Sequence, residues 1–151
     1  MKNKKFSLLV GFLLVVVMAV GCKDDVTKPK EENHLLVGTK WRLVAFVDFG
    51  IERLPDYAHV VDDDRRYLLS FDNDNTLSGS SLMNSLVGRY SVDYNTNKLS
   101  MTAGGTEMNE FGDGKLYREC LNEVQSFSFT DEELKLFYNN KENYLLFIRR
   151  Q

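Results

Sequence analysis

The amino-acid sequence predicts an α+β domain that is mostly β, with an antiparallel sheet and a single helix. Short segments in which apolar and polar side chains alternate recur along the chain, and turn-forming Asn, Asp and Gly residues separate them. This pattern is typical of antiparallel strands. One segment after residue 113 changes instead to the four-residue apolar spacing of a helix.

The central part of the domain, 67–102, is predicted to form an antiparallel meander. Tyr67, Leu69 and Phe71 point to one side of an extended segment. A turn follows at 73–75, where Asn and Asp tolerate left-handed backbone conformations. Further strands are predicted at 76–80, 88–92 and 98–102, with a loop of small residues around Asn84. The stretch 103–106 is expected to end the meander.

The domain opens with a predicted strand at 38–47. Its inner row contains Trp41, the only Trp of the chain, which is expected to anchor the core. A long polar connection follows at 48–66. Apolar residues of this connection are expected to cover one end of the core, namely Ile51, Leu54, Tyr57 and Val60.

The helix is expected to start at Asp113, a favourable residue for an N-cap. Leu116, Cys120 and Val124 recur every four residues and are predicted to share the inward face of the helix, with Tyr117 and Leu121 widening its apolar stripe. Burial of the Cys120 thiol in apolar surroundings is expected to make it unreactive. The closing strands are predicted at 127–129, 134–138 and 144–148.

The first 21 residues are predicted to be a signal peptide. Three Lys residues precede an apolar run of about fifteen residues, shorter than the ~20 residues of a membrane-spanning helix. The run ends in Ala19-Val20-Gly21-Cys22. These residues resemble a bacterial lipobox, in which the cysteine becomes the lipidated N-terminus. The resemblance implies that acyl chains on Cys22 anchor the protein to a membrane.

The predicted organisation is a lipoprotein signal peptide at 1–21, a lipidated Cys and flexible tether at 22–37, and one domain at 38–151. Lys23-Asp24-Asp25 resembles the acidic export signal of surface lipoproteins. The expected location is the outer membrane of a Gram-negative bacterium, on its periplasmic side or at the cell surface. The leader contains three of the 19 Lys and Arg and none of the 22 Asp and Glu. The resulting mature net charge of about −6 argues against nucleic acid as a partner.

The sequence contains no complete catalytic or metal-binding set, and no cofactor is expected. The domain has a single His, His59, too few for a His-based zinc site, and a hydrolase triad would depend on it alone. Asp72-Asn73-Asp74 begins like a calcium loop, but Leu77 and Met83 stand where that loop needs Gly and Glu. We therefore expect a protein that is not an enzyme.

Most aromatic residues of the predicted strands are expected to fill the core. Tyr90, Tyr94 and Tyr138 also carry hydroxyl groups that favour a wet surface. They are the candidates for a ligand-binding concave face.

The order of the elements resembles the META-domain family, which includes heat-inducible lipoproteins of the bacterial envelope. The similar segments are Gly38-Thr39-Lys40-Trp41-Arg42-Leu43, Leu69-Ser70-Phe71-Asp72, Leu77-Ser78-Gly79-Ser80, Asn84, Gly88-Arg89-Tyr90-Ser91-Val92, Leu99-Ser100-Met101, Thr106-Glu107-Met108 and Leu145-Leu146-Phe147. The resemblance implies a strongly curved antiparallel sheet, in effect a partial barrel, with one packed helix. It also implies an association with envelope stress tolerance and no established enzymatic activity.

This chain departs from the family at a cysteine pair, because Met83 and Asn109 occupy the two positions. The resemblance therefore implies a central loop that is held without a disulfide, and packing of Met83 and Leu86 beneath the loop is expected to replace it. Asn84, as organiser of the loop, and Gly88 are carried over as structural residues.

Lipocalin-like proteins also open on a Gly, a Trp and a strand, but their helix follows the barrel strands, whereas here it interrupts them. The expected function is that of a monomeric, lipid-anchored interaction module with an unknown protein or small-molecule partner. A carrier of a small apolar ligand and an inhibitor of an envelope hydrolase are the alternatives.

Overall fold

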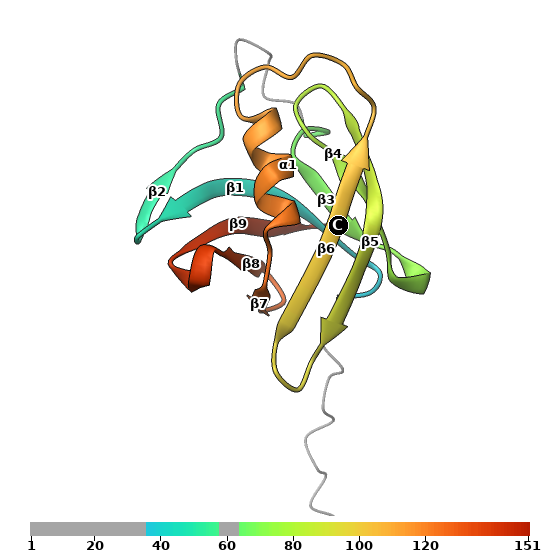
Figure 1. Cartoon of the computed structure of the whole chain (residues 1–151), viewed down its shortest axis with the longest axis vertical. Helices are drawn as coiled ribbons and strands as arrows, with labels where there is room; N and C mark the ends of the chain where they lie inside the picture. The colour runs from blue at the N-terminus through green and yellow to red at the C-terminus, as the bar shows by residue number, and fades with distance from the viewer. Residues whose placement is uncertain (1–35, 58–63) are drawn as a thin grey trace, which may run out of the picture. The chain divides into compact units, whose positions relative to one another are not determined.

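A computed structural model of the chain describes residues 36–57 and 64–151. The predicted signal peptide, Cys22 and nearly all of the predicted tether lie outside the described residues. The elements in chain order (Figure 1) are β1 (Thr39–Asp48), β2 (Ile51–Arg53), β3 (Leu68–Phe71), the 3₁₀ turn η1 (Asn73–Asn75), β4 (Thr76–Ser80), β5 (Ser85–Asp93), β6 (Lys98–Gly105), α1 (Gly114–Asn122), β7 (Ser126–Phe129), β8 (Glu133–Tyr138), the 3₁₀ turn η2 (Asn139–Lys141) and β9 (Asn143–Arg150).

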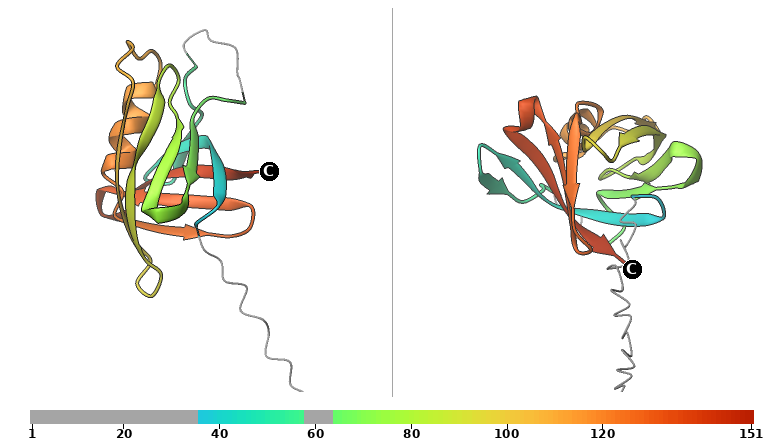
Figure 2. Two further views of the ribbon diagram at one scale, coloured as in Figure 1. Left: turned by 90° about the vertical axis from the view of Figure 1, so that its right-hand side faces the viewer. Right: turned by 90° about the horizontal axis from the view of Figure 1, so that it is seen from below.

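All of these strands belong to one antiparallel sheet. Its order is β2-β1-β3-β4-β5-β6-β7-β8-β9, and β1 pairs in addition with β9. The sheet therefore curves back on itself (Figure 2). Its narrowest junction is between β6 and β7, which are joined through the single pair Lys98 and Ser126. The prediction of a curved, partly closed antiparallel sheet with one helix is confirmed.

The helix α1 connects β6 to β7 and compensates for their short pairing. The amide group of Asn122 accepts a hydrogen bond from the Ala103 backbone N (2.7 Å) and donates one to the Ala103 carbonyl oxygen (3.1 Å). A side chain thus takes the place of a neighbouring strand along this part of β6. On the inward side of α1, the Tyr117 hydroxyl donates a hydrogen bond to the carbonyl oxygen of Leu68 in β3 at 3.2 Å.

Side chains fill the interior of the curved sheet. Its largest fully buried members are Trp41, Tyr67, Tyr117, Phe46, Phe71 and Phe147. The indole Nε1 of Trp41 donates to the Thr39 hydroxyl at 2.6 Å, which satisfies the only polar group of this buried ring. A carrier in the lipocalin manner would need this volume to be open to a ligand.

The sheet extends further than the sequence patterns predicted. β6 continues through Ala103-Gly104-Gly105, where the strand was expected to end. Gly104 pairs with Val87, and Gly105 pairs with Leu86 of β5. The prediction was wrong because the partner strand determines where a ladder ends, and glycines next to a well-formed strand continue the pairing.

The connection 48–66 is also more ordered than predicted. It contains β2, which pairs with β1 in a hairpin whose turn residues Phe49 and Gly50 both have positive φ (+49° and +81°), as a type I′ turn requires. Ile51 and Leu54 are 74% and 78% exposed, so they do not cover the core. Tyr57 does pack against the core, and Val60 lies outside the described residues.

The predicted apolar stripe of α1 is buried except at Leu116. Leu116 is 39% exposed, whereas Tyr117 and Leu121 are fully buried with Cys120 beside them at 5% exposure. Val124 is buried but follows the helix, which ends at Asn122. Asp113 stands at the N-cap position without making the capping hydrogen bond, because its carboxylate binds other groups.

Candidate functional site

An exposed apolar hairpin forms one edge of the sheet. β2 is the last strand in the sheet order, and the side chains of Phe49, Ile51 and Leu54 are 71%, 74% and 78% exposed. Single exposed apolar residues are ordinary on protein surfaces, but a cluster at an open sheet edge indicates an interaction site. Glu52 and Arg53 lie between Ile51 and Leu54 and give the edge a mixed charge.

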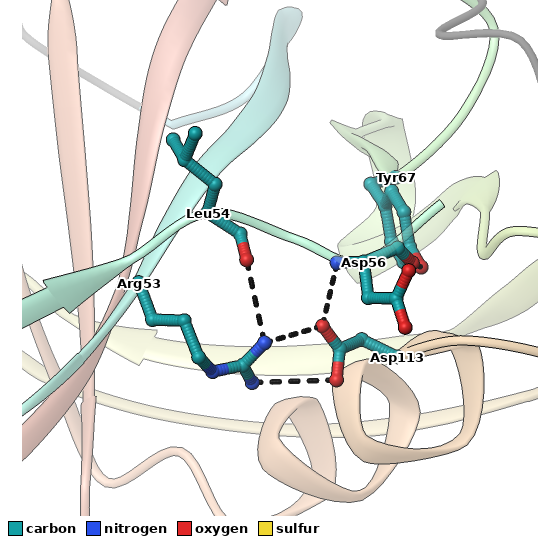
Figure 3. Close-up of polar contacts among 5 residues, drawn as sticks. All are labelled: Arg53, Leu54, Asp56, Tyr67 and Asp113. Atoms are coloured by element: carbon teal, nitrogen blue, oxygen red, sulfur yellow. Dashed lines mark hydrogen bonds and ion pairs between the residues drawn. The ribbon is translucent and has the colours of Figure 1, made fainter. Parts of the chain in front are cut away.

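An ion pair between the hairpin and the helix holds this edge in place (Figure 3). The Arg53 guanidinium donates two hydrogen bonds to the Asp113 carboxylate, at 2.6 Å (Nη1 to Oδ2) and 3.3 Å (Nη2 to Oδ1). This is the bidentate geometry that arginine favours with carboxylates. The hydrogen bond with Asp113 raises the pKa of Arg53 above its usual value. The guanidinium also lies 4.8 Å from the ring centroid of Phe46.

The segment after β2 is tied to the same carboxylate and to the core. The backbone N of Asp56 donates to Asp113 Oδ2 at 2.7 Å. The Asp56 carbonyl oxygen accepts from the Tyr67 hydroxyl at 2.7 Å, and the Tyr67 ring packs edge-on against Tyr57 and Tyr117. The exposed hairpin is therefore held by contacts with Tyr67, which directly precedes β3, and with Asp113, the N-cap residue of α1.

A second polar cluster holds the loop between β4 and β5. Asn84 is 2% exposed, and its Oδ1 accepts from the Thr106 hydroxyl (2.7 Å) and the Met108 backbone N (2.8 Å). Its Nδ2 donates to the Met108 carbonyl oxygen (2.9 Å) and to Glu110 Oε1 (2.7 Å). The amide thus joins the loop to the segment that leads into α1.

Glu110 completes this cluster from the other side. Its carboxylate accepts hydrogen bonds from the Ser81 hydroxyl and from the Met83 backbone N. Met83 is partly buried against the core and Leu86 is 1% exposed, so packing and hydrogen bonds act together to hold this loop. Sequence reasoning missed Glu110, because a lone acidic residue in a loop carries no local signal.

Each of the three tyrosines proposed as a ligand face forms a hydrogen bond within the protein through its hydroxyl group. Tyr90 is 4% exposed, and its hydroxyl donates to the Asp72 carbonyl oxygen at 3.3 Å. The Tyr94 hydroxyl accepts from the Leu36 backbone N at 3.1 Å, and the Tyr138 hydroxyl donates to Asp48 at 3.4 Å. Each hydroxyl is therefore bonded to the protein itself.

Gly88 lies inside β5 rather than in the loop, opposite Ala103 of β6.

Cys120 is buried, and this burial raises the pKa of its thiol to about 11, although a hydrogen bond with Tyr138 opposes the shift. Very little thiolate is present at neutral pH under these conditions.

In the described ranges, no group of three His, Cys, Asp or Glu side chains is placed to hold a metal ion. Asp72 instead accepts a hydrogen bond from the Ser78 hydroxyl at 2.6 Å, and Asp74 adopts a left-handed conformation within the turn η1. His59 lies outside the described residues. None of the described helices has the length and apolar character needed to cross a membrane.

No family model matches the chain, so the META-domain likeness remains a resemblance. A protein named "Putative lipoprotein" from Tannerella forsythia is 27% identical over 145 residues, which cover 96% of each chain. The crystal structure of a DUF4847 family protein from Bacteroides vulgatus has the same fold, with a TM-score of 0.58 at 18% identity. That likeness covers 76% of this chain and 94% of the other.

Proposed function

We propose that the protein is a lipid-anchored lipoprotein of a Gram-negative cell envelope that acts by binding a partner rather than by catalysis. The lipobox-like residues 19–22 and the printed name of the Tannerella relative support the anchoring. Because the match with that relative spans 145 of the 151 residues, it includes Cys22. Attachment to the outer membrane and a role in envelope stress tolerance belong to the same proposal.

Anchoring through Cys22 predicts a specific pattern of acylation in cells. Cells fed an alkyne analogue of palmitate should incorporate the label into the wild-type protein and into Cys120→Ser, but not into Cys22→Ser. The two substitutions are matched, because they remove the only two cysteines of the chain one at a time. Label that persists in Cys22→Ser, or that is lost from Cys120→Ser, would contradict the proposal.

The observation that carries the binding role is the exposed hairpin edge. β2 has β1 on one side, and its other edge has no strand partner in the described part of the chain. An open strand edge with exposed apolar side chains binds an added strand through backbone hydrogen bonds and side-chain contacts. We therefore assign the edge of β2 to an extended segment of a partner protein.

The position of the hairpin favours a protein over the lipid surface as its occupant. The described chain enters β1 at Leu36–Thr39, and the hairpin lies at the opposite end of this ten-residue strand. At ~3.3 Å per residue, about 30 Å separate the two ends. The edge of β2 thus lies well away from the point where the tether joins the domain.

Site-specific photocrosslinking in living cells tests this assignment. A photoreactive residue at Ile51 should crosslink to a protein, and the crosslinks should map to alternate residues of one extended partner segment. The control is the same residue at Val87, which is 61% exposed on β5 of the same sheet. Adducts with lipid alone, or equal yields from both positions, would refute the assignment.

A further inference from the structure

A pocket of about 240 Å³ opens on the outer face of the sheet, where β9, β1 and β3 run side by side. Lys40 of β1 stands opposite Arg150 of β9 and opposite Ser70 of β3. Side chains directly opposite in an antiparallel ladder point to the same face. These three residues therefore share the outer face, and all of them line the pocket together with Asp64, Arg65 and Leu68.

Serine side chains of β4 lie next to the β3 residues that line the pocket. On the outer face, Ser78 and Ser80 of β4 stand opposite Ser70 and Leu68 of β3. The Ser80 hydroxyl donates to the carbonyl oxygen of Arg65 and so fixes this residue beside the strands. The lining of the pocket thus combines the Ser70 hydroxyl with the basic side chains of Lys40 and Arg150.

Basic side chains outnumber acidic ones among the described residues that line the pocket, although the protein as a whole is acidic. Asp64 Oδ1 is shared by two arginines, at 2.9 Å from Nη1 of Arg42 and 3.2 Å from Nη1 of Arg150. Lys40 adds a further cation and has no ion-pair partner in the described part of the chain, whereas Arg65 already interacts with another group. Like charges directly opposite in a ladder, such as Lys40 and Arg150, destabilise the sheet. An anion bound between them would remove this repulsion.

We propose that this pocket binds a phosphate monoester group. Such a group carries about −1.5 to −2 charges at neutral pH and three acceptor oxygens, which suits converging ammonium and guanidinium donors and the Ser70 hydroxyl. The group belongs either to a free phosphorylated compound or to a lipid headgroup. Lys40 lies directly after the point where the tether joins the domain, so a headgroup of the anchoring membrane can be the source. Only this source rests on the proposed lipid anchor.

Titration of the full protein in nanodiscs of zwitterionic lipid tests the proposal. Inorganic phosphate and glycerol 3-phosphate, followed by calorimetry, should bind saturably and more weakly as the salt concentration rises. Lys40→Met should weaken binding about tenfold, the effect of losing one charge-assisted hydrogen bond. Because it also relieves the repulsion with Arg150, the same variant should unfold at a slightly higher temperature when no ligand is present.

Arg89→Met is the matched control. Arg89 is an exposed cation on β5, opposite Thr76 of β4 and outside the pocket, and its loss should change the affinity by less than about twofold. Discs that contain phosphatidic acid distinguish the two sources, because a bound headgroup would raise the apparent Kd for inorganic phosphate. If protein that has entered the discs shows no saturable phosphate binding, or if both variants lose the same affinity, the proposed phosphate site is wrong. Failure of the anchor would show instead as protein that does not enter the discs.

Discussion

Replacing Gly88 by valine should unfold most of the domain. A Cβ atom at this position would overlap the carbonyl oxygen of Thr102 on β6, and a backbone atom cannot move aside without breaking the ladder between β5 and β6. The expected loss is at least about 4 kcal/mol, a large part of the 5–15 kcal/mol by which domains of this size are stable. Denaturant unfolding followed by the fluorescence of Trp41, the only Trp, measures it.

Gly104→Val provides the control on the same pair of strands. Gly104 lies opposite Val87 on the outer face, and a Cβ atom there would meet nothing within 4 Å. Valine suits an exposed strand position, so stability should change by less than about 0.5 kcal/mol or rise slightly. Labelling of the buried Cys120 thiol gives an independent readout, because only unfolded protein exposes it. If Gly88→Val and Gly104→Val unfold at the same denaturant concentration, the close approach of β5 and β6 at Gly88 is not needed for the stability of the domain.

The sequence predicted the strands well where alternation alone determines them. The predicted strand at 76–80 coincides with β4, and the predicted turn at 73–75 coincides with η1. Both depend on interactions between residues close in sequence, which patterns of apolar and polar residues record directly. The ends of β5 and β6 were missed because each depends on its partner rather than on its own composition.

The edge strand β2 shows why other parts could not be predicted. Its three residues, Ile51–Arg53, are all exposed, so they display no alternation between buried and exposed positions. The strand is held by the turn before it and by Asp113, which lies sixty positions after Arg53. A contact over that distance leaves no periodic trace in the sequence, and Asp113 was assigned to a helix cap instead.

The pocket lined by Lys40 and Arg150 and the partners of Asn84 could not be predicted for the same reason, because their residues are far apart in the sequence. Lys40 and Arg150 are opposite each other in the sheet although they lie at the two ends of the domain. Asn84 was identified through the family resemblance, but its charged partner Glu110 was not, because its role follows only from the path of the loop before α1. Residue pairs of this kind can therefore be identified only from the folded structure, in which the strands are paired.

Replacing Asn84 by alanine should destabilise the domain by about 3 kcal/mol, because four hydrogen bonds are lost and the Glu110 carboxylate loses a buried donor. The matched control is Asn95→Ala in the exposed turn between β5 and β6, which should change stability by less than about 0.5 kcal/mol. Both values follow from denaturant unfolding of the full chain. Packing of Met83 and Leu86 alone would leave the two variants equally stable. A large difference between them means that this hydrogen-bonded cluster, and not packing alone, fixes the loop to the helix entrance.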